Sequence, residues 1–321
     1  MTLNDNELLP SERTVYTLRQ LYLSYGYKRY KVSKFEEYDL YAQNKSFLTD
    51  KSILTFTDTD GRLMALKPDI TLSIIKNIKD TQGTQKVFYN ECVYRASDSG
   101  FRELMQTGLE CIGNIELSLT AEVISLAYKS LERIGENFLI DISHMGFTMG
   151  LIDAITEDSN IKAQLMLAVQ AKSYDEVKEI CAQTKAGDRF SNALARACVL
   201  YGRPSDILKE ARDISVNAQT NAALDDLEGI VNIMSENGLT KNLRLDFSIL
   251  NDTNYYNGII FKGFIDGIPQ SVLSGGRYDS LLEKLGKNQG AIGFAVYLDS
   301  LDRLLMSKDT SATDGGDSIV G

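Results

Sequence analysis

Three short clusters of polar residues have the chemistry to bind a small polar molecule. The first is Lys67-Pro68-Asp69-Ile70-Thr71, in which Asp69 and Thr71 could face the amine of a ligand. Proline and a following carboxylate are also typical of a helix start, because proline suits the first turn and a negative charge stabilises the helix N-terminus. On spacing alone we favour the helix start over a binding role.

The second cluster, residues 102–110, reads Arg-Glu-Leu-Met-Gln-Thr-Gly-Leu-Glu. Alternate residues of a strand share one face, so Arg102, Gln106 and Glu110 would line up together around Gly108. Glu110 could accept a hydrogen bond from an ammonium group, and Gln106 could bind an amide or an imidazole. A solvated sheet face would give the same pattern, so both interpretations stay open.

The third cluster combines Tyr255-Tyr256 with Gly275-Gly276-Arg277-Tyr278. Paired glycines in a strand remove side chains where another group approaches the backbone, and a tight bulge would explain them equally well. The single histidine, His144, ends a predicted strand and has no evident partner nearby in the sequence. We therefore expect His144 to be structural.

Composition limits the classes of function that this chain can have. Its 321 residues are 43% hydrophobic, which predicts one large globular domain or two moderate ones. The four cysteines lie singly and only one histidine is present, so we expect no disulfide, metal site or cofactor. The net charge of −10 would repel a polyanion, which argues against a nucleic-acid partner.

The chain also lacks the sequence signals of export and membrane insertion. No stretch approaches the ~20 apolar residues that cross a bilayer. The N-terminus, Met1-Thr2-Leu3-Asn4-Asp5, does not show the basic and then apolar order of a signal peptide. We therefore expect a cytoplasmic protein with no membrane partner.

The elements that would position the clusters follow from hydrophobic spacing. Helical spacing predicts helices at 11–24, 68–77, 117–134 and 298–306. Strands are predicted at 87–95, 103–113, 137–143, 243–247, 255–264, 271–274 and 291–296, with a hairpin at Asp60-Gly61. Strands on both sides of a helical stretch predict an α+β fold with one antiparallel sheet built from both halves of the chain.

Residues 151–239 contain helical patterns and no strand candidate. Helix starts are predicted at Asp158-Ser159 and at a capping box formed by Ser173 and Glu176. We expect a core domain at 1–150 and 240–306, an inserted helical subdomain at 151–239 and a disordered tail at 307–321.

The order of the clusters resembles the histidyl-tRNA synthetase family, which belongs to the class II aminoacyl-tRNA synthetases. Residues 67–71 look like its Arg-Pro-Glu-Gly-Thr element, and 102–113 look like its second class-defining motif, with Gln106, Gly108 and Glu110 as the core. Tyr255-Tyr256-Asn257-Gly258 resembles the end of the histidine-specific loop. Ser274 to Asp279 with Gly293-Phe294-Ala295 resembles the approach to the third motif, and the resemblance covers about residues 8–306.

This resemblance implies a class II synthetase-like antiparallel sheet flanked by helices. It also implies a histidine pocket lined by Asp69, Thr71, Gln106, Glu110, Tyr255, Tyr256 and Tyr278. Arg95, Gly275 and Gly276 would mark a vestigial nucleotide site.

The chain departs from the synthetase pattern where catalysis would need it. Asn251 and Ser300 stand where the family places catalytic arginines, and Lys34 replaces a proline of the first motif. Losing one fixed donor to a transition state typically reduces the rate ~10²- to 10³-fold. The sequence also ends where the anticodon-binding domain of the synthetases follows. We therefore expect no catalytic residues and no synthetase chemistry.

A shortened relative without these arginines resembles the regulatory subunits of ATP phosphoribosyltransferase. That family implies a homodimer within a hetero-oligomer that contains a short catalytic subunit. It implies activation of this partner in the first step of histidine biosynthesis, with histidine as the feedback effector. We expect histidine to bind in the inherited pocket, and a site at the subunit interface is the alternative. The alternatives are a stand-alone ligase that activates an amino acid for a non-tRNA acceptor, and a tRNA sensor.

Overall fold

A nine-stranded mixed sheet forms the frame of the computed structural model, which describes residues 10–44, 48, 53–78, 83–97, 100–250 and 256–301. Asn251, Tyr255 and the expected tail at 307–321 lie outside these ranges. The strands, in sheet order, are β1 (Lys28–Arg29), β5 (Gln85–Ser97), β6 (Gly100–Gly113), β12 (Gly290–Tyr297), β11 (Leu273–Arg277), β10 (Ile259–Ile265), β7 (Phe138–His144), β9 (Leu243–Asp246) and β8 (Tyr201–Gly202).

The predicted antiparallel sheet is confirmed from β5 through β7, where every neighbouring pair is antiparallel. Two pairs towards the edges, β1 with β5 and β7 with β9, are parallel. Parallel neighbours need a long crossover, and residues 30–84 and 145–242 supply one each. The sheet is therefore mixed, and its antiparallel centre joins the two halves of the chain as expected.

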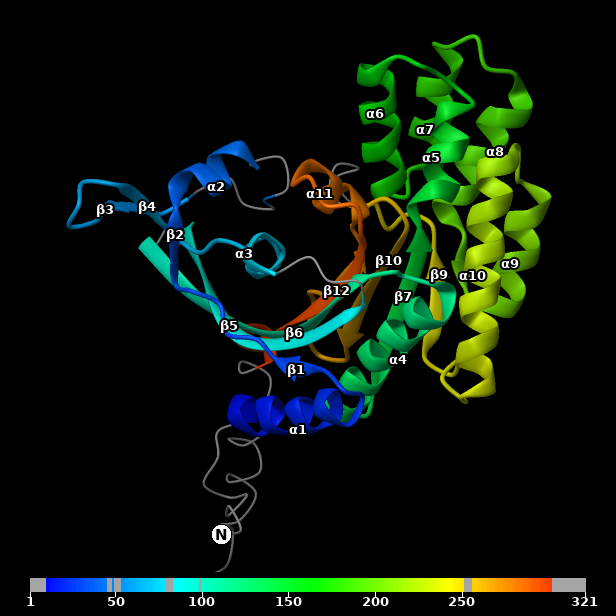
Figure 1. Ribbon diagram of the computed structural model, residues 1–321. Helices are drawn as coiled ribbons and strands as arrows, with labels where there is room; N and C mark the ends of the chain where they lie inside the picture. Colours follow the sequence, from blue (N-terminus) through cyan, green and yellow to red (C-terminus); the bar gives the residue numbers. More distant parts are fainter. Residues whose placement is uncertain are drawn as a thin grey trace, which may run out of the picture.

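Helices cover both faces of this sheet. Figure 1 shows α3 (Ile70–Asn77) in the hollow of the curved sheet and α1 (Pro10–Ser24) on the opposite side. α4 (Leu117–Ile134) packs against α1 and against β10 and β12. Along β6, Leu109 faces the hydrophobic core under α1 and α4, whereas Ile112 faces the core around α3. This alternation leaves the even-numbered residues of β6 on the α3 side.

A small three-stranded sheet stands beside α3 (Figure 1). It contains β2 (Phe35–Glu37), β4 (Leu63–Leu66) and β3 (Thr55–Thr57) in that order. The hairpin predicted at Asp60-Gly61 is confirmed, and Gly61 has the positive φ of 82° that such a turn requires. The sequence patterns gave no indication of α2 (Tyr38–Gln43) or of α11 (Asp279–Lys284).

The segment 151–239 is helical, as the patterns predict, and its helices stack at the β7–β9 side of the sheet (Figure 1). They are the end of α5 (Met145–Asp153), then α6 (Ser159–Gln170), α7 (Tyr174–Ala182), α8 (Asp188–Val199), α9 (Pro204–Asp213) and α10 (Ala218–Glu236). The expectation that no strand occurs here is wrong, because β8 pairs with β9. Two residues are too few to produce an alternating pattern.

The capping box predicted at Ser173 and Glu176 is also wrong. Ser173 precedes α7, but its side chain makes no capping hydrogen bond. The Asp158 cap of α6 is confirmed, and its carboxylate accepts hydrogen bonds from the backbone N–H groups of Asn160 and Ile161. The capping box lies instead at the start of α10, between Asn217 and Thr220.

The described chain ends in a helical turn at 298–301, which agrees with the start of the helix predicted at 298–306. Among the described residues, no helix has the length and apolar character to span a membrane.

Candidate functional site

A cavity of about 320 Å³ lies on the α3 side of the sheet. Six of the seven residues predicted to bind histidine line it, and the seventh, Tyr255, lies outside the described residues. The six are Asp69, Thr71, Gln106, Glu110, Tyr256 and Tyr278. They come from the start of α3, from β6 and from the segments beside β10 and β11, so the predicted set is brought together by elements far apart in the sequence.

Glu110 is the centre of the polar contacts in this cavity. Its side chain is 1% exposed, Thr71 Oγ1 donates to Glu110 Oε1 over 2.7 Å, and the Tyr278 hydroxyl donates to Oε2. Burial raises the pKa of Glu110 to about 8. The nearby Asp69 carboxylate also raises this pKa, whereas the two hydrogen bonds lower it. Glu110 therefore readily holds a proton at neutral pH, and a cationic ligand would stabilise its ionised form.

Asp69 serves both roles that the sequence left open. It is the N-cap of α3, and its carboxylate accepts a hydrogen bond of 2.7 Å from Leu72 N–H. It also lines the cavity, where burial raises its pKa against the opposing effects of that hydrogen bond and of Arg95 and Lys67. The favoured helix start is confirmed, and the same carboxylate is available to the cavity.

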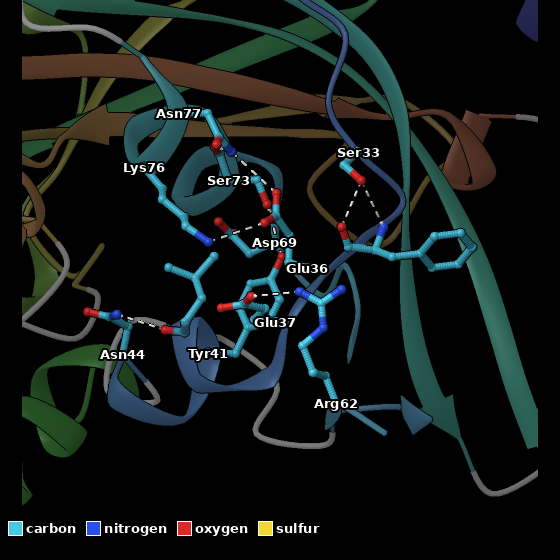
Figure 2. Close-up of polar contacts among 12 residues, drawn as sticks. Ser33, Glu36, Glu37, Tyr41, Asn44, Arg62, Asp69, Ser73, Lys76 and Asn77 are labelled. Atoms are coloured by element: carbon cyan, nitrogen blue, oxygen red, sulfur yellow. Dashed lines mark hydrogen bonds and ion pairs between the residues drawn. The ribbon is translucent and has the colours of Figure 1, made fainter. Parts of the chain in front are cut away.

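A network of hydrogen bonds holds α3 in place (Figure 2). The hydroxyl groups of Tyr41 and Ser73 are 2.9 Å apart, and Asn77 Nδ2 donates to the Ser73 carbonyl over 2.8 Å. Lys76 and Asn77 both reach the Glu36 carboxylate. These contacts join α3 to α2 and to the small sheet, so they fix the positions of Asp69 and Thr71 at the cavity.

A buried ion pair anchors the segment that leads into α3. Lys67 is 0% exposed, and its Nζ lies 3.3 Å from Glu91 Oε2 on β5. Removing one partner of a buried pair leaves an uncompensated charge, which destabilises a protein strongly. The sequence pattern identified Lys67 only as part of the first cluster, because its partner is 24 positions away.

Glycines make room for the side chains around Glu110. A Cβ on Gly293 would lie 1.7 Å from Glu110 Oε2, and one on Gly276 would lie 2.6 Å from the Tyr256 ring. A Cβ on Gly275 would lie 2.5 Å from Phe294 Cβ. The strand β11 pairs regularly with β10 and β12 through both glycines, so the bulge interpretation is wrong and close packing explains the pair.

A second cavity of about 620 Å³ adjoins the first and shares Arg95, Gln106, Ser271 and Tyr297 with it. Arg95 Nε is buried and has no hydrogen-bond partner. Ser300, where the synthetase resemblance would place an arginine, lines this cavity beside Arg95 and Arg102. The resemblance thus implies a hydroxyl in place of the cation that the transition state of an adenylation reaction needs. The vestigial nucleotide role of Arg95, Gly275 and Gly276 stays a prediction.

His144 has a structural role, but the expectation that it lacks a partner is wrong. Its Nδ1 accepts a hydrogen bond of 3.0 Å from Gly146 N–H at the start of α5. Its Nε2 lies 3.5 Å from Asp226 Oδ2 on α10. Asp226 is 82 positions away, so no local pattern could reveal the pair. No group of three or more potential metal ligands occurs within the described ranges.

The sequence profile of the family described as Histidyl-tRNA synthetase matches residues 3–301. A curated relative, the ATP phosphoribosyltransferase regulatory subunit of Clostridium kluyveri, is 31% identical over 313 residues, which cover 94% of this chain and 80% of the relative. This chain belongs to the ATP phosphoribosyltransferase regulatory subunit family. Membership of this family agrees with the prediction of a regulatory subunit without synthetase chemistry.

Solved structures of the family share the fold. The crystal structure of an ATP phosphoribosyltransferase regulatory subunit/histidyl-tRNA synthetase from Bacillus halodurans has a TM-score of 0.84 at 24% identity and covers 92% of this chain and 79% of its own. A chain of the ATP phosphoribosyl transferase (HisG:HisZ) complex from Thermotoga maritima has a TM-score of 0.70 at 19% identity, over 89% of this chain and 96% of its own. At these identities the likeness establishes the class II synthetase-like fold.

Proposed function

We propose that this chain activates a short catalytic subunit of ATP phosphoribosyltransferase and carries the site at which histidine inhibits that enzyme. The partner would be the catalytic subunit of the first step of histidine biosynthesis. The chain would act as a homodimer within a hetero-oligomer in the cytoplasm, without a nucleic-acid or membrane partner. It would perform no chemistry of its own.

The cavity of about 320 Å³ around Glu110, which we call the Glu110 cavity, is the main support for histidine as the effector. Buried Glu110 and half-buried Asp69 supply two carboxyl groups, which suit an ammonium group and an imidazole N–H. Gln106 and Tyr256 line the same cavity and add hydrogen-bonding groups. A site with convergent polar groups of this kind favours a small polar cation or zwitterion over an apolar ligand.

Thermodynamic linkage explains how a bound amino acid would inhibit a separate subunit. If histidine binds the less active state of the assembly more tightly than the active state, it shifts the equilibrium by that difference in affinity, typically ~1 to 3 kcal/mol. The catalytic subunit must then change the affinity for histidine by the same factor. No reacting group is needed in this chain.

Reconstitution with a purified short catalytic subunit tests this function. We expect the two chains to co-elute, the rate of ATP phosphoribosyl transfer to rise on mixing, and histidine to reverse that rise. The substitution Glu110→Gln should weaken inhibition by histidine at least tenfold, because one charge-assisted contact is lost. The matched substitution Glu103→Gln, on the exposed end of β6, should leave both activation and inhibition unchanged.

Two results would refute the proposal. One is failure of the two chains to co-elute or to alter the rate. The other is histidine-dependent exchange of pyrophosphate into ATP by this chain alone, which would identify it as a ligase.

A further inference from the structure

Four charged residues line the Glu110 cavity. Asp69 and Glu110 are acidic, and Arg95 and Lys262 are basic. Lys262, on β10, is half-buried, and its ammonium makes neither an ion pair nor a hydrogen bond to any residue in the described ranges. A partly desolvated cation without a counter-charge is unfavourable, so a ligand that supplies an anionic group to Lys262 gains binding energy.

Arg95 Nε is also without a hydrogen-bond partner among the described residues, but the charge of Arg95 is compensated in part by the Asp69 carboxyl group. Arg95 acts electrostatically on the Asp69 carboxyl group and lowers its pKa. It also stands at the boundary between the two cavities, whereas Lys262 lines only the smaller one. Lys262 is therefore the less compensated cation of the Glu110 cavity.

The floor of the cavity leaves room between Lys262 and the acidic side. Gly108, Ala295, Ser274 and Lys262 are successive register partners across β6, β12, β11 and β10. Gly108, Ala295 and Ser274 have small side chains, so they occupy little of the cavity. Three strand spacings of about 4.8 Å separate β6 from β10 by about 14 Å. Glu110 lies two residues further along β6, in the row that ends at Ile260, so the backbones of Glu110 and Lys262 are about 16 Å apart. Both long side chains extend into this span, which leaves room for a small zwitterion between them.

We propose that Lys262 binds the carboxylate of the amino-acid ligand and thereby selects a zwitterion over a simple cation. This inference rests on the proposed function of the cavity as an amino-acid site. The acidic groups at the start of α3 and on β6 would bind the cationic groups of the ligand. Lys262 would bind its carboxylate from β10.

Calorimetric titration of the full chain with histidine and with histidinamide tests the role of Lys262. The amide keeps the ammonium and imidazole groups and replaces the carboxylate by a neutral group. We expect the unmodified chain to bind histidine about ten- to a hundredfold more tightly than histidinamide. In Lys262→Gln that preference should fall at least about tenfold, because histidine loses affinity while the amide does not.

Two further variants separate charge recognition from damage to the fold. Lys262→Arg keeps a cation and should retain the preference. Lys178→Gln removes a half-buried lysine of α7 that does not line the cavity, so it should leave both affinities unchanged. An unaltered preference in Lys262→Gln, or equal losses for both ligands, would overturn the role of Lys262 while leaving the amino-acid site intact. Absence of histidine binding to the unmodified chain would refute the proposed effector and this inference with it.

Discussion

Glu110 combines complete burial with two hydrogen bonds, and the balance between them determines its protonation. Burial disfavours the charged carboxylate, whereas the donors Thr71 and Tyr278 favour it. Burial dominates, since the pKa is raised to about 8 from an ordinary 4.5. Near neutral pH, a cationic ligand beside Glu110 would therefore favour release of its proton.

The raised pKa of Glu110 predicts a specific dependence of stability on pH. Between pH 4.5 and about 8 the folded protein holds a proton that the unfolded chain has released, so this group's contribution to the free energy of unfolding falls as pH rises. Glu110→Gln removes this contribution. Relative to the unmodified chain, the variant should gain at least about 1.4 kcal/mol between pH 5 and pH 8, the equivalent of one pKa unit.

Denaturant unfolding of the ligand-free chain at several pH values measures this difference. The pKa of Glu103 is lowered by hydrogen bonds from Cys92 and Tyr94, so Glu103→Gln should show no comparable gain over the same range. A constant difference between Glu110→Gln and the unmodified chain from pH 5 to pH 8 would show that Glu110 is ionised throughout.

At the scale of elements, the sequence predicted what depends on local periodicity. The helix at 117–134 and the hairpin at Asp60-Gly61 were predicted because their patterns lie within a few turns or residues. The parallel edges, β8 and the Asp226 partner of His144 were not, since each depends on residues brought together from distant positions. The site residues were found through their resemblance to a family, and Lys262 was missed because a lone lysine in a strand shows no pattern.

Helix starts show how similar sequence signals can differ in effect. Asp158 and Ser173 both precede predicted helices, yet only Asp158 makes capping hydrogen bonds. Replacing an effective N-cap by alanine typically costs about 1 kcal/mol. We therefore expect Asp158→Ala to lower the free energy of unfolding by about this amount and Ser173→Ala to change it by only a few tenths. Chemical denaturation of both variants would decide, and equal losses would contradict the assignment of caps.

At the scale of the molecule, a short segment after β9 connects the helices of residues 151–239 to the cavity. Leu250 lines the cavity, and its carbonyl accepts a hydrogen bond of 3.0 Å from Gln170 Nε2 at the end of α6. Four residues earlier, Asp246 pairs with Lys172 over 2.8 Å. A ligand that orders the cavity wall would therefore also restrain the end of α6. Energetic coupling between two sites is carried by contiguous contacts of this kind.

Hydrogen–deuterium exchange with and without histidine tests this connection. We expect histidine to slow exchange in 246–250 and also in 165–172 at the end of α6. Gln170→Ala should at least halve the protection at 165–172 and leave the affinity for histidine unchanged, because Gln170 does not line the cavity. Gln164→Ala, at an exposed position of the same helix, should retain the full protection. Protection confined to the cavity strands in the unmodified chain would show that the helices of residues 151–239 do not respond to the ligand. Any coupling to a catalytic partner would then involve another surface of the protein.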